Sequence, residues 1–316
     1  MNNPVLSALI PVVILIALGF LAGRKGWIGG AGVKDLSGMV FVVLTPPLLF
    51  RTMSTVRVEQ LDFRPIASYF IAVAVIFGAT LAWKGFNRNG AVLALGNTFS
   101  NTVMIGIPLV GLAYGDAGLV VLFTLIAVHS LVMLTIATVV LEIALLREEA
   151  AAGRHSGRHI AHTALLALRN AVIHPVPLPI IAGLLFAQTG WVIPAVIDKP
   201  LQLMANAFGP LALLLVGATL AATKVGEQWR GALALTAVKN LVLPALVAAV
   251  GWALGLTGVP LAVMVLVAAL PMGANVFLFS QRYKVAEERI TAGIAVSTAL
   301  GLVTLSLVMW VLSSRA

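Results

Sequence analysis

The sequence of 316 residues contains no cysteine, and only 10% of it is charged. Without cysteine, neither disulfide bonds nor thiolate-ligated metal sites can form. Soluble domains carry roughly 25% charged residues, whereas this chain is 60% hydrophobic and has a mean hydropathy of +1.06. The composition therefore predicts an all-α polytopic membrane protein.

Acidic residues are also scarce, with 11 Asp and Glu against 20 Lys and Arg. No carboxylate falls near the middle of an apolar segment, where proton- and sodium-coupled carriers usually place one. The net charge of +9 does not predict a nucleic-acid partner, because the basic residues lie in short loops between apolar segments. Motifs typical of hydrolases and metalloproteases are missing, so we expect neither catalysis nor a bound metal or cofactor.

What the sequence does contain is a series of apolar segments, each near the 20 residues that cross a bilayer. The first has no basic segment before it and is followed by Arg24 and Lys25, which favours a retained span over a cleaved signal peptide. Glycine and proline mark most junctions. The ten predicted spans are residues 5–23, 36–53, 65–83, 91–113, 117–141, 172–189, 201–221, 232–254, 260–280 and 290–312.

A polar connection over residues 147–170 separates a first five-helix unit, 1–146, from a second, 171–316. An odd number of spans in each half makes the halves insert with opposite polarity, so if they are repeats, they are inverted repeats. The connection contains His155, His159 and His162, but no carboxylate or cysteine frames them as metal ligands. We therefore interpret it as a solvated, partly helical linker.

The basic residues predict the orientation. Positive charge collects on the cytoplasmic side, so the predicted topology places both termini outside and the linker in the cytoplasm, in a cell (inner) membrane. The outer loop 51–64 is an exception, because it holds three arginines. The basic residues of the predicted inner loops are Arg24, Lys25, Lys34, Lys84, Arg88, Arg147, Arg154, Arg158, Arg169, Lys224, Arg230, Arg282, Lys284 and Arg289.

Two spans carry helix-breaking residues at matching positions of the two halves. Backbone groups freed at mid-membrane cost several kcal/mol each unless protein or an aqueous cavity satisfies them, and paired interrupted helices indicate a transporter's binding site. The alternative is a bundle of proline-kinked structural helices. The first break is predicted at Gly106–Pro108, after Asn97 and Asn101, and the second at Pro271–Gly273, before Asn275.

These stretches resemble the auxin efflux carrier family, which includes plant PIN-type carriers and bacterial dicarboxylate permeases. The resemblance covers nearly the whole chain. One departure is HPVPLP at 174–179, where the family more often has Asn-Pro, so no polar role is transferred to His174. The motifs that carry the resemblance are GNTFSNTVMIGIPLVGLAYGD (96–116), LPMGANVFLFSQRYKV (270–285), the Ser- and Thr-rich last span, and the pair PPLLF (46–50) and GPLALLLVGATLA (209–221).

The resemblance implies a fold of ten transmembrane helices arranged as two inverted five-helix repeats, with the broken helices 4 and 9 crossing at the midplane. It also implies a carrier of small organic anions that is often a homodimer. The substrate stays open between a small dicarboxylate, such as malonate or malate, and an aromatic acid such as an auxin. A sodium-coupled organic-anion symporter of the bile-acid type is the alternative, while an enzyme or a channel fits less well.

Several residues are candidates for holding such an anion. Half-helix N-termini at mid-membrane offer free N–H groups and partial positive charge, and asparagines four residues apart share a helix face. Each asparagine has the alternative of bonding a neighbouring helix, and a buried lysine or His129 has a structural alternative. The predicted substrate-binding residues are Asn97, Asn101, Gly106, Pro108, Lys239, Pro271, Gly273 and Asn275.

Overall fold

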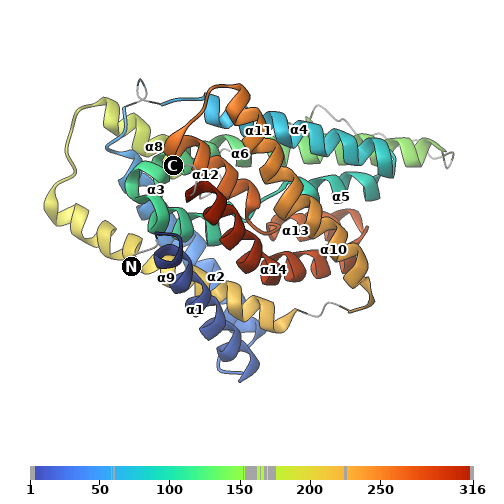
Figure 1. Ribbon diagram of the computed structural model, residues 1–316, viewed down its shortest axis with the longest axis horizontal. Coiled ribbons are helices and arrows are strands. Elements are labelled where there is room, and N and C mark those ends of the chain that lie inside the picture. Colours follow the sequence, from blue (N-terminus) through green and yellow to red (C-terminus); the bar gives the residue numbers. More distant parts are fainter. Residues whose placement is uncertain are drawn as a thin grey trace.

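A computed structural model describes residues 4–57, 59, 61–151, 153, 162–163, 165–166, 169, 176–223 and 226–313 (Figure 1). His174 and most of the predicted linker, including His155 and His159, lie outside the described residues. Within that part of the chain all regular elements are helices, and the one β feature is an isolated bridge.

The helices follow the apolar segments of the sequence. Several begin or end at glycine or proline, as expected from the missing N–H of proline and the conformational freedom of glycine. They are α1 (Pro4–Arg24), α2 (Gly30–Met39), η1 (Val40–Leu44), α3 (Thr45–Met53), α4 (Arg64–Lys84), α5 (Arg88–Thr98), η3 (Thr102–Gly106), α6 (Ile107–Ala151), α8 (Pro177–Gln188), α9 (Ala195–Ala222), η4 (Gly226–Gln228), α10 (Trp229–Ala237), η5 (Val238–Val242), α11 (Leu243–Ala253), α12 (Gly258–Ala269), α13 (Asn275–Tyr283) and α14 (Glu287–Ser313).

Three of these elements, η1, η3 and η5, are π-helical, and a proline follows each at the same distance. The prolines are Pro46, Pro108 and Pro244, each in the first turn of the next α-helix. A proline has no N–H to donate and crowds the carbonyl four residues before it. Widening the helix by one residue just before the proline relieves that conflict, so the helix continues without breaking.

Seven described helical segments are long and apolar enough to cross a membrane. The difference from ten predicted spans has a clear origin. Predicted span 260–280 is interrupted after α12, and α8, the described helix of predicted span 172–189, is only 12 residues long. Predicted spans 91–113 and 117–141 meet at Gly115, where the backbone is not helical (φ 58°, ψ −153°), but the one long segment Thr102–Ala151 contains the end of the first and all of the second. The chain is thus a multi-pass helical membrane protein, and the ten-span inverted repeat stays a prediction.

The helices pack into two groups, and α6 contacts both. In the first group α1 lies along α9, and α3 packs on α8 and α9 (Figure 1). In the second group α4 packs on α5 and α11, and α14 packs on α10 and α12. Both groups mix the two predicted halves of the chain, so neither half has its own closed core.

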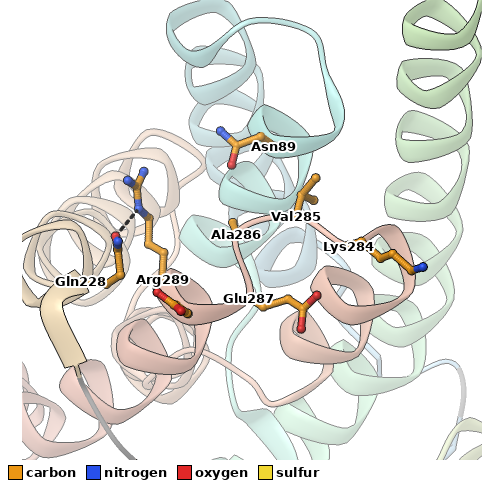
Figure 2. A pocket seen from close by; sticks show the side chains of 8 residues that line it. Asn89, Gln228, Lys284, Val285, Ala286, Glu287 and Arg289 are labelled. Carbon is orange, nitrogen blue, oxygen red and sulfur yellow. Dashed lines mark hydrogen bonds between the residues drawn. The ribbon is translucent and has the colours of Figure 1, made fainter.

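The two ends of the bundle each carry a cavity. One, of about 320 Å³, is lined by residues of α5, η4 and the α13–α14 turn, including Asn89, Gln228 and Arg289 (Figure 2). In that cavity the Arg289 Nε donates to the Gln228 side-chain oxygen at 3.4 Å. Its lining comes entirely from predicted inner loops and their flanks, whereas the other cavity is lined by predicted outer segments and their flanks.

Candidate functional site

The two helix breaks lie against each other in the interior. The α5 helix ends at Thr98 and helical structure resumes at Thr102, while α12 ends at Ala269 and α13 begins at Asn275. Between them the two extended stretches run antiparallel and form a bridge from Ser100 to Met272. The crossing therefore joins segments that are far apart in sequence.

Main-chain hydrogen bonds hold this crossing together. The Asn101 N–H donates to the Pro271 carbonyl, and the Gly273 N–H donates to the Phe99 carbonyl, each at 2.9 Å. The Met272 N–H donates to the Ser297 hydroxyl of α14 at 3.1 Å. These bonds satisfy backbone groups that no helix satisfies, which is the condition for non-helical backbone at membrane depth.

The predicted position of the first break was wrong by several residues. Gly106 and Pro108 lie in continuous helix, and the break falls at Phe99–Asn101, where the backbone is extended at Phe99 (ψ 110°). Pro108 is the second residue of α6 and directly follows the π-helical turn η3, which accommodates its missing N–H. The predicted second break, at Pro271–Gly273, coincides with the observed one.

Both glycines predicted as site residues lie at close contacts between the two halves of the crossing. A Cβ on Gly273 would lie 2.7 Å from Cδ1 of the Phe99 ring, and one on Gly106 would lie 2.9 Å from Leu270 Cδ1. Both distances are shorter than a real Cβ contact allows. Each glycine thus allows the close approach of the other half of the crossing.

Of the three predicted asparagines, Asn101 is the one whose main chain is hydrogen-bonded across the crossing. Its side-chain oxygen accepts a hydrogen bond from the Met104 N–H at 3.3 Å and caps η3. That bond orients the amide, and no acceptor for its NH₂ group is found among the described residues. Asn101 is partly exposed, so a solute that reaches the crossing finds two N–H donors there.

The other two asparagines have different surroundings. Asn97 is buried, and its side-chain NH₂ group donates to the Thr80 hydroxyl of α4 at 3.1 Å. This bond joins two helices, which is the structural alternative to a role in substrate binding. Its side-chain oxygen has no hydrogen-bond partner among the described residues. Asn275 begins α13 and is half-buried. The structure therefore brings Asn101 and Asn275 to the two breaks and places Asn97 one turn back in the helix.

Lys239 lies in η5 and is fully buried. Its ammonium group donates to the carbonyl oxygens of Ala268 and Leu270, at 2.6 and 2.7 Å. These carbonyls belong to the last turn of α12 and the start of the break, where partial negative charge collects. The side chain thus places a basic amino group at the crossing while its hydrogen bonds go to the main chain.

Sequence reasoning missed several residues that hold the breaks. The Tyr69 hydroxyl of α4 lies 3.0 Å from the Ser100 hydroxyl, and Asn240 donates to the Ser297 carbonyl at 3.0 Å. Tyr69 and Lys239 come from the predicted third span of each half, and each reaches the break of its own half. An inverted-repeat comparison of those two spans would have been the signal that pointed to Tyr69.

His129 of α6 is buried beside the first break. Its ring centre is 4.7 Å from that of Phe99 and 5.6 Å from that of Tyr69, both at steep angles. The Nε2 atom has no hydrogen-bond partner among the described residues. The ring fills space between aromatic side chains at the crossing, but no hydrogen bond of its Nε2 supports the alternative of a hydrogen-bonded structural histidine.

Comparison with known proteins decides the family. The sequence matches the family described as "Membrane transport protein" over residues 4–309. The chain belongs to this family. In the described part of the chain no group of three or more His, Asp or Glu could hold a metal ion, and the family is one of transporters rather than enzymes.

Three relatives of the membrane transport protein family span nearly their whole length. A protein of Rhizobium meliloti (strain 1021) named "Putative malonate transporter" is 27% identical, over 97% of this chain and 95% of its own. "Uncharacterized transporter YfdV" of Escherichia coli (strain K12) is 26% identical over 97% and 96%. "Auxin efflux carrier component 8" of Arabidopsis thaliana is 23% identical over 95% of each. The resemblance to auxin efflux carriers is thereby confirmed.

Proposed function

We propose that the protein is a secondary transporter of small organic anions, mono- or dicarboxylates such as malonate or malate, that works by alternating access at the crossing of its two broken helices. The observation that carries the proposal is the hydrogen-bonded crossing in the interior of a helical membrane transporter. The Rhizobium relative named for malonate supports a small dicarboxylate. The Arabidopsis relative keeps an auxin-like aromatic acid as the alternative substrate.

The chemistry of the crossing suits a carboxylate. The Asn101 amide offers N–H donors, the start of α13 at Asn275 offers the positive end of a half-helix, and Lys239 places a basic amino group nearby. Carboxylates bind such ends through backbone N–H groups and the helix dipole. Within the proposal the crossing is shaped by Gly106, Pro108, Pro271 and Gly273. Asn97 lies in the last turn of α5, before the first break.

Other parts of the assignment belong to the same proposal. We infer an inner-membrane location with both termini outside from the distribution of basic residues, and a homodimer from the family resemblance. The lack of a carboxylate near the middle of an apolar segment supports transport driven by the anion gradient and the membrane potential rather than by sodium.

Ligand-dependent thermal stability tests the substrate. The purified protein is melted with malonate, malate, acetate and indole-3-acetate, in sodium and in choline buffers. A ligand present at 100 times its Kd stabilises the folded protein by about 2.7 kcal/mol. We expect a rise in Tm with malonate or malate that is equal in both buffers and that Asn101→Ala abolishes.

Asn206, an exposed asparagine of α9, provides the matched control. Asn206→Ala should keep the malonate-dependent rise in Tm, while Asn101→Ala should lose the rise and also lower the ligand-free Tm slightly, because the cap bond to the Met104 N–H is lost. A rise that needs sodium would instead favour the symporter of the bile-acid type. No rise with any of the acids, together with no uptake into proteoliposomes, would contradict the proposed substrate class.

A further inference from the structure

A second cavity, of about 520 Å³, lies at the end of the bundle formed by the predicted outer segments. It is lined by the last turn of α3, the start of the second part of α6, the end of α8 and the first turn of α9. Its charged lining residues are Arg51, Asp116 and Asp198, and Phe186 and Trp191 supply aromatic surface. The cavity is large enough for a small dicarboxylate and a shell of water.

Arg51 already holds a carboxylate in this cavity. Its Nε donates to Oδ1 of Asp198 at 2.6 Å and its Nη2 donates to Oδ2 at 3.1 Å. This two-bond geometry is the strongest arrangement between arginine and a carboxylate. The side chains of Arg51 and Asp198 are 35% and 32% exposed, so a dissolved carboxylate can reach the pair.

Two helices connect the lining of this cavity to the region of the first break. From Asp116, the chain runs back through the kink at Gly115 to Pro108 in the first turn of α6. From Asp198, α9 runs to Gly209, where a Cβ would lie 3.8 Å from Pro108. The same two helices therefore line the cavity and meet at Pro108, between the cavity and the first break.

We propose that Arg51 forms an outer carboxylate-binding site, at which a substrate carboxylate replaces Asp198 on the guanidinium group before it passes to, or after it leaves, the crossing. The inference rests on the proposed function. Asp198 keeps Arg51 extended when the cavity is empty and competes with the substrate when it is occupied. Asp116 adds negative charge to the same cavity, so a carboxylate is held weakly and leaves again.

If this proposal is correct, removing the arginine raises KM, whereas neutralising either aspartate lowers KM. In malonate counterflow into proteoliposomes, Arg51→Gln should raise KM about tenfold, because two charge-assisted hydrogen bonds are lost. Asp198→Asn should lower KM severalfold, because an uncharged amide competes less well for the guanidinium. Asp116→Asn should also lower KM. The maximum rate should change little in all three, since the crossing is intact.

The matched control is Arg57→Gln, which removes the same charge from an exposed arginine that does not line the cavity. It should leave KM unchanged. Arg51→Lys keeps the charge but loses the two-bond geometry, and should raise KM by an intermediate factor. Melting temperatures of all variants report whether the ion pair also holds α3 to α9.

The outcomes distinguish a failure of the outer site from a failure of the proposed function. If the wild type transports malonate but Arg51→Gln matches Arg57→Gln, or if Arg51→Gln and Asp198→Asn change KM in the same direction, the outer site is refuted and the transporter stands. If the wild type transports none of the acids, the proposed function fails and the outer site fails with it.

Discussion

At the scale of single residues, Lys239 has the most demanding environment in the protein. A charged side chain in a membrane protein interior is costly unless it is paired. Here two main-chain carbonyls at the end of α12 pair it. Removing the ammonium would leave both carbonyls buried without a donor, and an unsatisfied buried group costs roughly 1–3 kcal/mol.

Lys239→Met should therefore lower the Tm of the purified protein strongly, whereas Lys239→Gln, which keeps an N–H donor, should lower it less. Lys199→Met is the control, because Lys199 is exposed and its bond to Gln202 is 3.3 Å long. If Lys239→Met melted like wild type, the bonds to α12 would not contribute to stability. If Lys239→Gln kept the wild-type substrate affinity, its charge would have no part in binding.

At the scale of elements, the crossing depends on how closely two extended segments approach. Gly273 makes this approach possible, since its Cα faces the ring of Phe99 and the Ser100 carbonyl. Added volume in such a packed position typically costs about 1–3 kcal/mol. The extended pairing of Phe99 with Gly273 would have to separate to accept even one methyl group.

Gly273→Ala should lower both the Tm and the transport rate. Gly78 of α4 offers a contrasting control, because a Cβ there meets nothing within 4 Å. Gly78→Ala should be neutral or raise the Tm, since alanine favours the helix by up to about 1 kcal/mol over glycine. Equal melting temperatures for the two variants would contradict the close packing at the crossing.

The helix elements also show where local sequence reasoning succeeds. A proline at Pro108 predicts a disturbed helix, and the structure has one, a π-helical turn just before it. The same disturbance precedes Pro46 and Pro244. The position of a proline alone could not show whether the helix widens by one residue or breaks. The break at Phe99–Asn101 is stabilised by hydrogen bonds to a segment about 170 residues away in the chain.

At the scale of the whole molecule, polar residues tie helices together at the predicted inner end. Arg88 at the start of α5 bonds Glu148 of α6 and the Tyr283 carbonyl of α13, and the Tyr283 hydroxyl donates to Glu142. The cavity in Figure 2 lies at the same end. Residues that charge counting assigns to one side of the membrane are therefore neighbours in the structure.

The natural absence of cysteine makes the orientation testable with single cysteines. Trp191→Cys, in the outer cavity, should react with a membrane-impermeant maleimide in intact cells. Asn89→Cys, in the inner cavity, should react only after the membrane is permeabilised. Both positions are exposed, so accessibility within the protein does not differ between them. The reverse labelling pattern would invert the predicted topology.

Hydropathy and loop charge alone determine that this chain is a multi-pass membrane protein, because the bilayer selects long apolar segments whatever lies beside them. The motifs around Asn101 and Pro271 were enough to indicate the family. Only the tertiary structure decided that the first break falls at Phe99–Asn101, that Lys239 bonds α12, and that Tyr69 and Ser297 hold the crossing. These features depend on hydrogen bonds between residues distant in sequence, whose partners no local pattern specifies.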